Sequence, residues 1–260
     1  MKYPLIPLAA VILLCGCGPS IPENSALQCY NPNFYQAGNQ FALATYVDGR
    51  MQSVQQWQMK AGEFHDQAAV VTEISTNSLQ QPLKYQLWAS RYNQVDAEQS
   101  QFLALAVEFN NQRDFGLISR TFSPAVPESF NFLEADESSD FSYQSVEQSL
   151  TFGVVFTHEQ QYQRTTRFVG MESITTPAGS FDTCHLQYTK QRINNDGEPA
   201  EPQIEDAWYA KQLGVPVKLA NANGVYQLLL EGQINDTRIT LPSQVRNQFN
   251  LPQQAPAVAQ

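Results

Sequence analysis

Histidine is the side chain best suited to acid–base and metal chemistry near neutral pH, and the chain contains three, His65, His158 and His185. Each has an acidic residue close by in the sequence, a pairing that can orient an imidazole for proton transfer. None of the three belongs to a His-x-x-x-His or similar spacing that holds a metal ion. The sequence therefore predicts no metal site, and we expect these histidines on the surface or on strand faces.

Glu172 is the carboxylate with the most distinctive surroundings, because it lies within a segment of unusual composition, Gly170–Cys184. A lone carboxylate can act as a general acid or base, but no second one follows at a fixed spacing. We therefore expect Glu172 to be a solvent-facing or cross-strand partner. The chain also lacks a Gly-x-Ser-x-Gly elbow, a phosphate-binding glycine loop and a dinucleotide fingerprint. These observations favour a protein that is not an enzyme and uses no cofactor; an envelope hydrolase built from dispersed residues is the enzymatic alternative.

The N-terminus has the features of an export signal. Lys2 supplies a positive charge, and Leu5–Leu14 is an apolar run interrupted only by Pro7. This run is too short to span a bilayer, which takes about 20 residues, and small residues follow it. We expect residues 1–16 to be a signal peptide.

The end of this segment, Leu14-Cys15-Gly16-Cys17, resembles the lipobox of bacterial lipoproteins. The resemblance implies cleavage after Gly16 and acylation of Cys17, so that residues 17–28 become a lipidated tether to the membrane. Gly18 stands where an Asp would retain such a protein at the inner membrane, which implies the outer membrane with the body facing the periplasm. The cell surface is the alternative location. An ordinary signal peptide with incidental cysteines, or an uncleaved anchor, is the alternative to lipidation.

Two cysteines remain after cleavage and lipidation, Cys29 and Cys184. In an oxidising compartment they predict one disulfide that closes a loop of about 150 residues, worth ~4–5 kcal/mol in the chain-entropy model. Two buried free thiols are the alternative. The absence of a Cys-x-x-Cys pair argues against a thiol oxidoreductase.

Beyond Asn33 the main pattern is period-two alternation interrupted by turns, which is typical of an antiparallel meander. Asp48-Gly49 suits a two-residue type I′ hairpin, because both central residues must take positive φ. Residues 95–109 fit either a helix or a strand, and the alternation of Leu103, Leu105 and Val107 favours a strand. The fold class predicted is mainly β, with few short helices.

The body is expected to cover residues 29–240, with two similar halves as an alternative, 29–122 and 142–240. An acidic segment with Pro124 and Pro127 would join the halves as a loop. Residues 241–260 contain several prolines and are expected to be a flexible tail.

The most characteristic internal segment is Thr176-Pro177-Ala178-Gly179, in which Pro177 suits the second position of a type I turn and Gly179 a left-handed bulge. Together with Phe181, Cys184 and the later Trp208-Tyr209-Ala210 and Gly214-Val215, it resembles a module of bacterial envelope proteins of unknown function. The resemblance implies a curved antiparallel sheet, with an open half-barrel as one form of it, and brings no catalytic residues. Pro216 departs from a freely paired strand, because proline cannot donate to a ladder.

The formal net charge of −10, from 15 Lys and Arg against 25 Asp and Glu, argues against a nucleic-acid partner. The sequence favours an interaction or structural module in the envelope, with a protein partner. A carrier of a lipid or small apolar ligand is the alternative, because Trp57, Trp88 and Trp208 could line an apolar cavity as well as fill a core.

Overall fold

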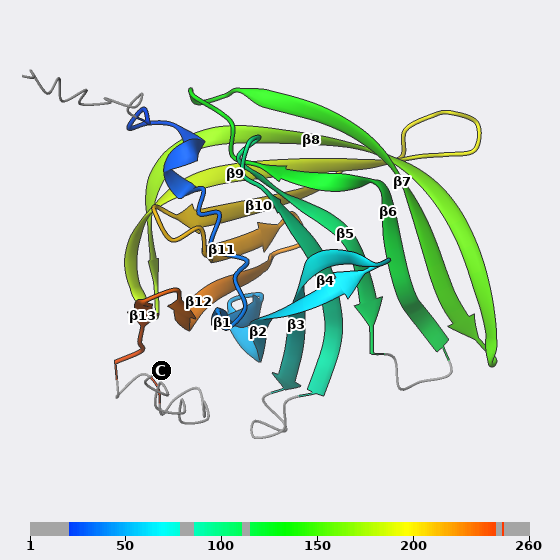
Figure 1. Cartoon of the computed structure of the whole chain (residues 1–260), viewed down its shortest axis with the longest axis horizontal. Coiled ribbons are helices and arrows are strands. Elements are labelled where there is room, and N and C mark those ends of the chain that lie inside the picture. Colours follow the sequence, from blue (N-terminus) through cyan, green and yellow to red (C-terminus); the bar gives the residue numbers. More distant parts are fainter. Residues whose placement is uncertain (1–20, 79–85, 111–114, 243–245, 247–260) are drawn as a thin grey trace, which may run out of the picture.

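The computed structural model describes residues 21–78, 86–110, 115–242 and 246. Its strands form one antiparallel sheet in which neighbours in the chain are neighbours in space, from β1 to β13. Because β1 also pairs with β12, the sheet closes on itself as a barrel, and β13 attaches to β12 alone (Figure 1). The predicted mainly-β meander is confirmed, and its curvature continues to closure where the resemblance suggested an open half-barrel. Within the described residues, no helix is both long and apolar enough to cross a bilayer.

The strands are β1 Gln40–Val47, β2 Arg50–Phe64, β3 Gln67–Ser78, β4 Gln86–Asp96, β5 Gln101–Phe109, β6 Phe115–Ser129, β7 Ser138–Thr151, β8 Val154–Thr176, β9 Gly179–Ile193, β10 Gln203–Ala210, β11 Pro216–Asn221, β12 Val225–Ile234 and β13 Thr237–Ile239. The 3-10 turn η1 Ala26–Cys29 precedes them.

The hairpins form where the sequence supplies residues that tolerate positive φ. Asp48 and Gly49 have φ of 49° and 72° between β1 and β2, as a type I′ turn requires. Within the ambiguous segment 95–109, β5 is a strand as predicted, and Asp96 joins the turn before it by accepting the Gln99 N–H at 3.1 Å.

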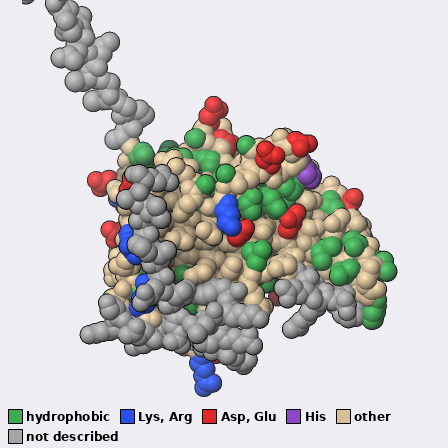
Figure 2. All heavy atoms as spheres, turned by 60° about the horizontal axis from the view of Figure 1, so that its bottom comes forward, with side chains coloured by type: hydrophobic (Ala, Val, Ile, Leu, Met, Phe, Trp, Pro, Cys, Tyr) green, Lys and Arg blue, Asp and Glu red, His purple; other side chains and the backbone are tan. Residues whose placement is uncertain are grey.

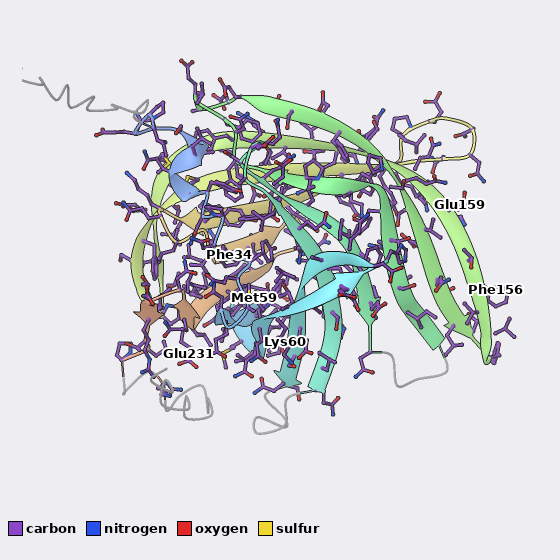
Figure 3. The ribbon with its side chains drawn as sticks, viewed as in Figure 1. Phe34, Met59, Lys60, Phe156, Glu159 and Glu231 are labelled. Atoms are coloured by element: carbon purple, nitrogen blue, oxygen red, sulfur yellow. A yellow bond between two sulfur atoms is a disulfide. The ribbon has the colours of Figure 1, made fainter. Side chains whose placement is uncertain are left out.

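In a meander the connections alternate between the two ends of the barrel, and one end is closed by residues 21–39. This N-terminal segment forms hydrogen bonds with three connections of that end. Tyr30 bonds to the β4–β5 turn, and Ala26 bonds to the β6–β7 loop. Gln212, in the β10–β11 loop, bonds to the segment in turn. Phe34 is buried among core aromatics (Figure 3). We call this the plugged end, and the opposite one the open end.

The predicted disulfide joins the N-terminal segment to the barrel. Cys29 and Cys184 are bonded with their Cα atoms 6.1 Å apart and both are fully buried. The bond spans a sequence separation of 155 residues, so it ties η1 to the middle of β9. The prediction of a Cys29–Cys184 bridge is confirmed.

Two expected irregular segments are shorter than predicted. Residues 123–129 belong to β6 and not to a loop, since Pro127 pairs opposite Leu103 and the register shift around Ala104 accommodates the proline-containing stretch. The connection is therefore 130–137. The tail expected from residue 241 is also partly fixed, because Leu241 is 6% exposed and Arg246 lies 2.8 Å from the Glu231 carboxylate. The sheet itself runs without interruption through both expected halves.

Candidate functional site

The interior of the barrel is hollow toward the open end. A cavity of about 630 Å³ lies between the plugged end and the opposite rim. Its walls come from β1–β12, and at the rim it reaches residues next to the connections of the open end, including Trp88, Phe109 and Tyr226. Its volume falls in the range of about 300–1,000 Å³ that holds one small ligand.

Small inward-facing side chains help to leave this space in the interior. Five alanines line it: Ala89, Ala104, Ala106, Ala207 and Ala220. At the plugged end, Phe102, Phe130 and Phe168 are 1% exposed or less and fill the same interior. The alanines leave space in the barrel beside these large side chains, and aromatic residues such as Trp88, Phe109 and Phe122 line the cavity toward the open end.

Two kinds of wall face each other across this space. Trp57, Ile74 and Ala89 on β2–β4, with Leu219 on β11, form an apolar wall. Strands β6–β10 contribute the polar lining residues Arg120, Glu128, Tyr143, Arg164, Lys190 and Glu205. The cavity is therefore amphipathic.

Three of the basic residues that line the cavity rest on aromatic rings. Arg164 lies 4.2 Å from the centre of the Tyr188 ring, and Lys190 lies 4.3 Å from that of Tyr162. Arg91 lies 5.3 Å from the Trp57 ring, on the apolar side. Such contacts hold a cation in place without neutralising it. Among the described residues, none of these three forms an ion pair with a carboxylate.

The fourth cation, Arg120, is paired: its Nε lies 2.9 Å from Glu147, which also accepts a hydrogen bond from the Tyr162 hydroxyl. Burial, followed by the nearby Arg120 guanidinium, lowers the pKa of Lys190, while Glu205 and Glu147 oppose that shift. On this wall the cations Arg120, Arg164 and Lys190 therefore lie beside the carboxylates Glu128 and Glu205, and Glu147 pairs with Arg120.

Tyrosines form the floor beneath the cations. The Tyr188 and Tyr209 hydroxyls are 3.2 Å apart, and Arg164 also donates to the Pro127 carbonyl at 3.2 Å. Burial is the main cause that raises the pKa of Tyr35, Tyr188 and Tyr209, and the Glu128 carboxylate raises all three further. These groups stay protonated and can donate hydrogen bonds.

A second polar cluster lies on the other face of the same strands. His185 contacts Glu172 through Nδ1 at 3.1 Å and Asp206 through Nε2 at 2.8 Å, and it stacks on Trp208. Trp208 donates to Glu172 at 2.5 Å. Glu172 is thus the cross-strand partner that the sequence predicted. Asp206 could not be recognised because only the β9–β10 register brings it to His185.

The other predicted residues are separate from these clusters. His65 stacks on Phe64 in the β2–β3 turn, and His158 lies near Gln160 on β8. Pro177 lies in the β8–β9 turn, and Gly179 opens β9 with φ of 133°, a conformation that residues with side chains rarely adopt. Within the described residues no group of three or more His, Cys, Asp or Glu side chains is placed to hold a metal ion. Cys17 lies outside the described residues.

Of the three tryptophans, Trp57 and Trp88 line the cavity, and Trp208 belongs to the outer cluster instead. The remaining large exposed apolar group is the tip of the β7–β8 hairpin. Phe152 is 81% exposed, and Val154, Val155 and Phe156 are each more than half exposed. Figure 3 places Phe156 far from Phe34, and Figure 2 shows a group of hydrophobic side chains at the right of the view.

Solved structures with a similar chain course exist. One is a protein described as exported, with a YmcC-like fold, from Bacteroides fragilis (15% identity, 75% of this chain and 94% of that chain, TM-score 0.43). Another is described as a lipoprotein from Parabacteroides distasonis (16% identity, 79% and 99%, TM-score 0.45). A third is the hypothetical lipoprotein YmcC from Escherichia coli (9% identity, 78% and 88%, TM-score 0.37). At these TM-scores the likenesses do not indicate what this chain binds. No family model and no curated protein matches.

Proposed function

We propose that this protein is a lipoprotein of the bacterial outer membrane that binds a small amphipathic molecule in its barrel and does not turn it over. The cavity of about 630 Å³, with one apolar and one charged wall, is the observation that carries this proposal. The Leu14-Cys15-Gly16-Cys17 pattern supports the lipid anchor. The carrier alternative from the sequence thus becomes the leading one.

The anchor and the cavity would lie at opposite ends of the barrel. Ile21 is the first described residue and lies at the plugged end, four residues after Cys17. Four residues span at most about 14 Å. An acylated Cys17 would therefore hold the plugged end close to the bilayer, and the open end would face the aqueous side, from which the ligand would enter.

Two measurements test this proposal. Labelled palmitate is expected to enter the wild-type protein and not Cys17→Ser. Native mass spectrometry of the mature protein, purified from membranes in a non-ionic detergent, is expected to show one bound small molecule. Ala104→Phe, which places a ring in the cavity, is expected to abolish the adduct. Leu103→Phe, at the next position of β5 and outside the cavity lining, is the matched control. An empty wild-type protein would contradict ligand binding.

A specific observation also favours the role in envelope interactions that the sequence suggested first. Phe152, Val154, Val155 and Phe156 form an exposed apolar tip with no charged residue, which is a common feature of contact surfaces. A photo-crosslinking residue at position 152 in living cells is expected to capture one protein reproducibly. The same residue at Leu133, which is 48% exposed in the β6–β7 loop of the plugged end, is the control. Equal capture from both positions would count against a docking tip.

A further inference from the structure

We propose that the cavity recognises a single-chain anionic amphiphile, with its acidic group held between Arg164 and Lys190 and its chain against the apolar wall. This inference rests on the proposed function, because it names the class of molecule that the barrel binds. It adds the charge of the ligand, its orientation and the residues that bind its acidic group.

The charge of the ligand follows from the distribution of cations. Four of the chain's 15 Lys and Arg residues line this one cavity, together with the acidic residues Glu128, Glu205 and Asp206. Three of those four rest on aromatic rings and pair with no carboxylate of the described chain. A cation removed from bulk water is unfavourable unless an anion or strong acceptor is near. An acidic group between these side chains would relieve that penalty.

The position of the acidic group follows from the register of β8 and β9. Arg164 and Lys190 are directly opposite each other in the ladder, so both side chains leave the same point of the wall. Burial is the main cause that lowers the pKa of Lys190; Arg120 and Arg164 lower it further, and Glu205 and Glu147 raise it. Three positive groups therefore lie close together, with the ring of Tyr188 against Arg164.

The apolar part follows from the opposite wall and the volume. Trp57, Ile74, Ala89 and Leu219 offer an apolar surface, on which Arg91 lies over the Trp57 ring. Trp57 is stacked on Phe41 at 5.3 Å, which fixes its ring. A cavity of about 630 Å³ suits a ligand of drug size. We therefore infer one chain and not the two chains of an ordinary phospholipid.

The test compares two lysolipids with the same acyl chain in native mass spectrometry of the mature, acylated protein. Lysophosphatidylglycerol, which carries net negative charge, is expected to bind about tenfold more tightly than zwitterionic lysophosphatidylcholine. Glycerol 3-phosphate has the acidic group without the chain and is expected not to displace the lysolipid. If it displaces the lysolipid, the ligand is a free phosphate and the inference is wrong.

Variants locate the preference. Arg164→Gln and Lys190→Met are each expected to reduce the preference for the anionic lysolipid over lysophosphatidylcholine several-fold. Arg167→Gln is the matched control, since Arg167 is three residues further along β8 and pairs with Asp136 outside the cavity. Circular dichroism checks that each variant is folded. If Arg164→Gln does not fold, Lys190→Met still tests the inference.

The outcomes separate the two proposals. If neither lysolipid binds, the proposed function itself fails. If both bind equally well, the barrel binds amphiphiles but the charge inference is overturned. If the anionic preference survives in Arg164→Gln and Lys190→Met, the acidic group is not held where we place it, and the inference is overturned as well.

Discussion

The two ends of this barrel are built from the same strands and the same alternation, yet one is solid and the other is hollow. At the plugged end Phe34, Phe130 and Phe168 are at most 4% exposed, and a disulfide fixes the N-terminal segment over them. Toward the open end, inward positions carry alanines and long charged side chains that remain partly accessible. The comparison teaches that stability and function are separated along the axis: the closed half supplies the core that lets the other half stay open.

The largest effect on stability should come from removing the disulfide of the plugged end. The Cys29→Ser, Cys184→Ser double variant is expected to lose about 5 kcal/mol of unfolding free energy, because a loop of this length gains much entropy in the unfolded chain when the bond is absent. Urea denaturation with and without reductant measures the loss. Reductant should destabilise the wild-type protein by a similar amount and leave the double variant unchanged. A double variant as stable as the oxidised wild type would show that the plug holds without its bond.

Raising the pH should also weaken the plugged end. Burial raises the pKa of Tyr188 and Tyr209 above 10, so the folded chain keeps protons that the unfolded chain loses. The unfolded state is therefore favoured as the pH rises above 10, by about 1.4 kcal/mol per pH unit for each such tyrosine. The lowered pKa of Lys190 has the opposite effect: just below its ordinary value of 10.5, it makes the folded state more stable as the pH rises. Lys190 is a single group, so the tyrosines outweigh it.

Urea denaturation between pH 8 and 11.5 measures this loss of stability. Tyr209→Phe is expected to lose less stability over this range than the wild-type protein, because it removes one of the titrating groups. Parallel curves for the two proteins would mean that the floor does not govern alkaline unfolding.

Matched insertions probe the comparison directly. Ala26→Phe adds a ring to a fully buried site of the plugged end and is expected to destabilise the fold by roughly 1–3 kcal/mol through overpacking. Ala104→Phe adds the same ring to the cavity wall, where there is space, and should change stability by less than about 1 kcal/mol. Thermal unfolding of both variants measures the difference. Equal losses would mean that the cavity is not an open space in solution.

The sequence predicted what depends on local pattern and missed what depends on long-range pairing. Alternation and the Asp48-Gly49 turn were enough for the meander, and cysteine counting was enough for the disulfide. Closure was not predictable, because it needs β1 to meet β12, at the far end of the chain. The cavity cations were missed for the same reason: Arg120, Arg164 and Lys190 lie on three strands and share no motif. Pairing registers bring them together, and no spacing in the sequence records a register.

The smallest effect concerns the tip of the open end. Phe152 has φ of 50°, in the left-handed region where a bulky side chain is rare and costs about 1 kcal/mol or more. Asparagine tolerates this conformation, so Phe152→Asn is expected to raise the unfolding free energy slightly, by about 0.5–1 kcal/mol. Phe156→Asn is the control: Phe156 lies in β8 without positive φ, and it should show no gain.

Differential scanning calorimetry measures the difference between these two variants. If Phe152→Asn is more stable than the wild type and also loses the crosslinked protein partner, Phe152 lowers the stability of the tip but provides a contact surface. A Phe152→Asn variant less stable than the wild type would show instead that the phenylalanine stabilises the hairpin. The tip would then contribute to the stability of the fold, as the plugged end does.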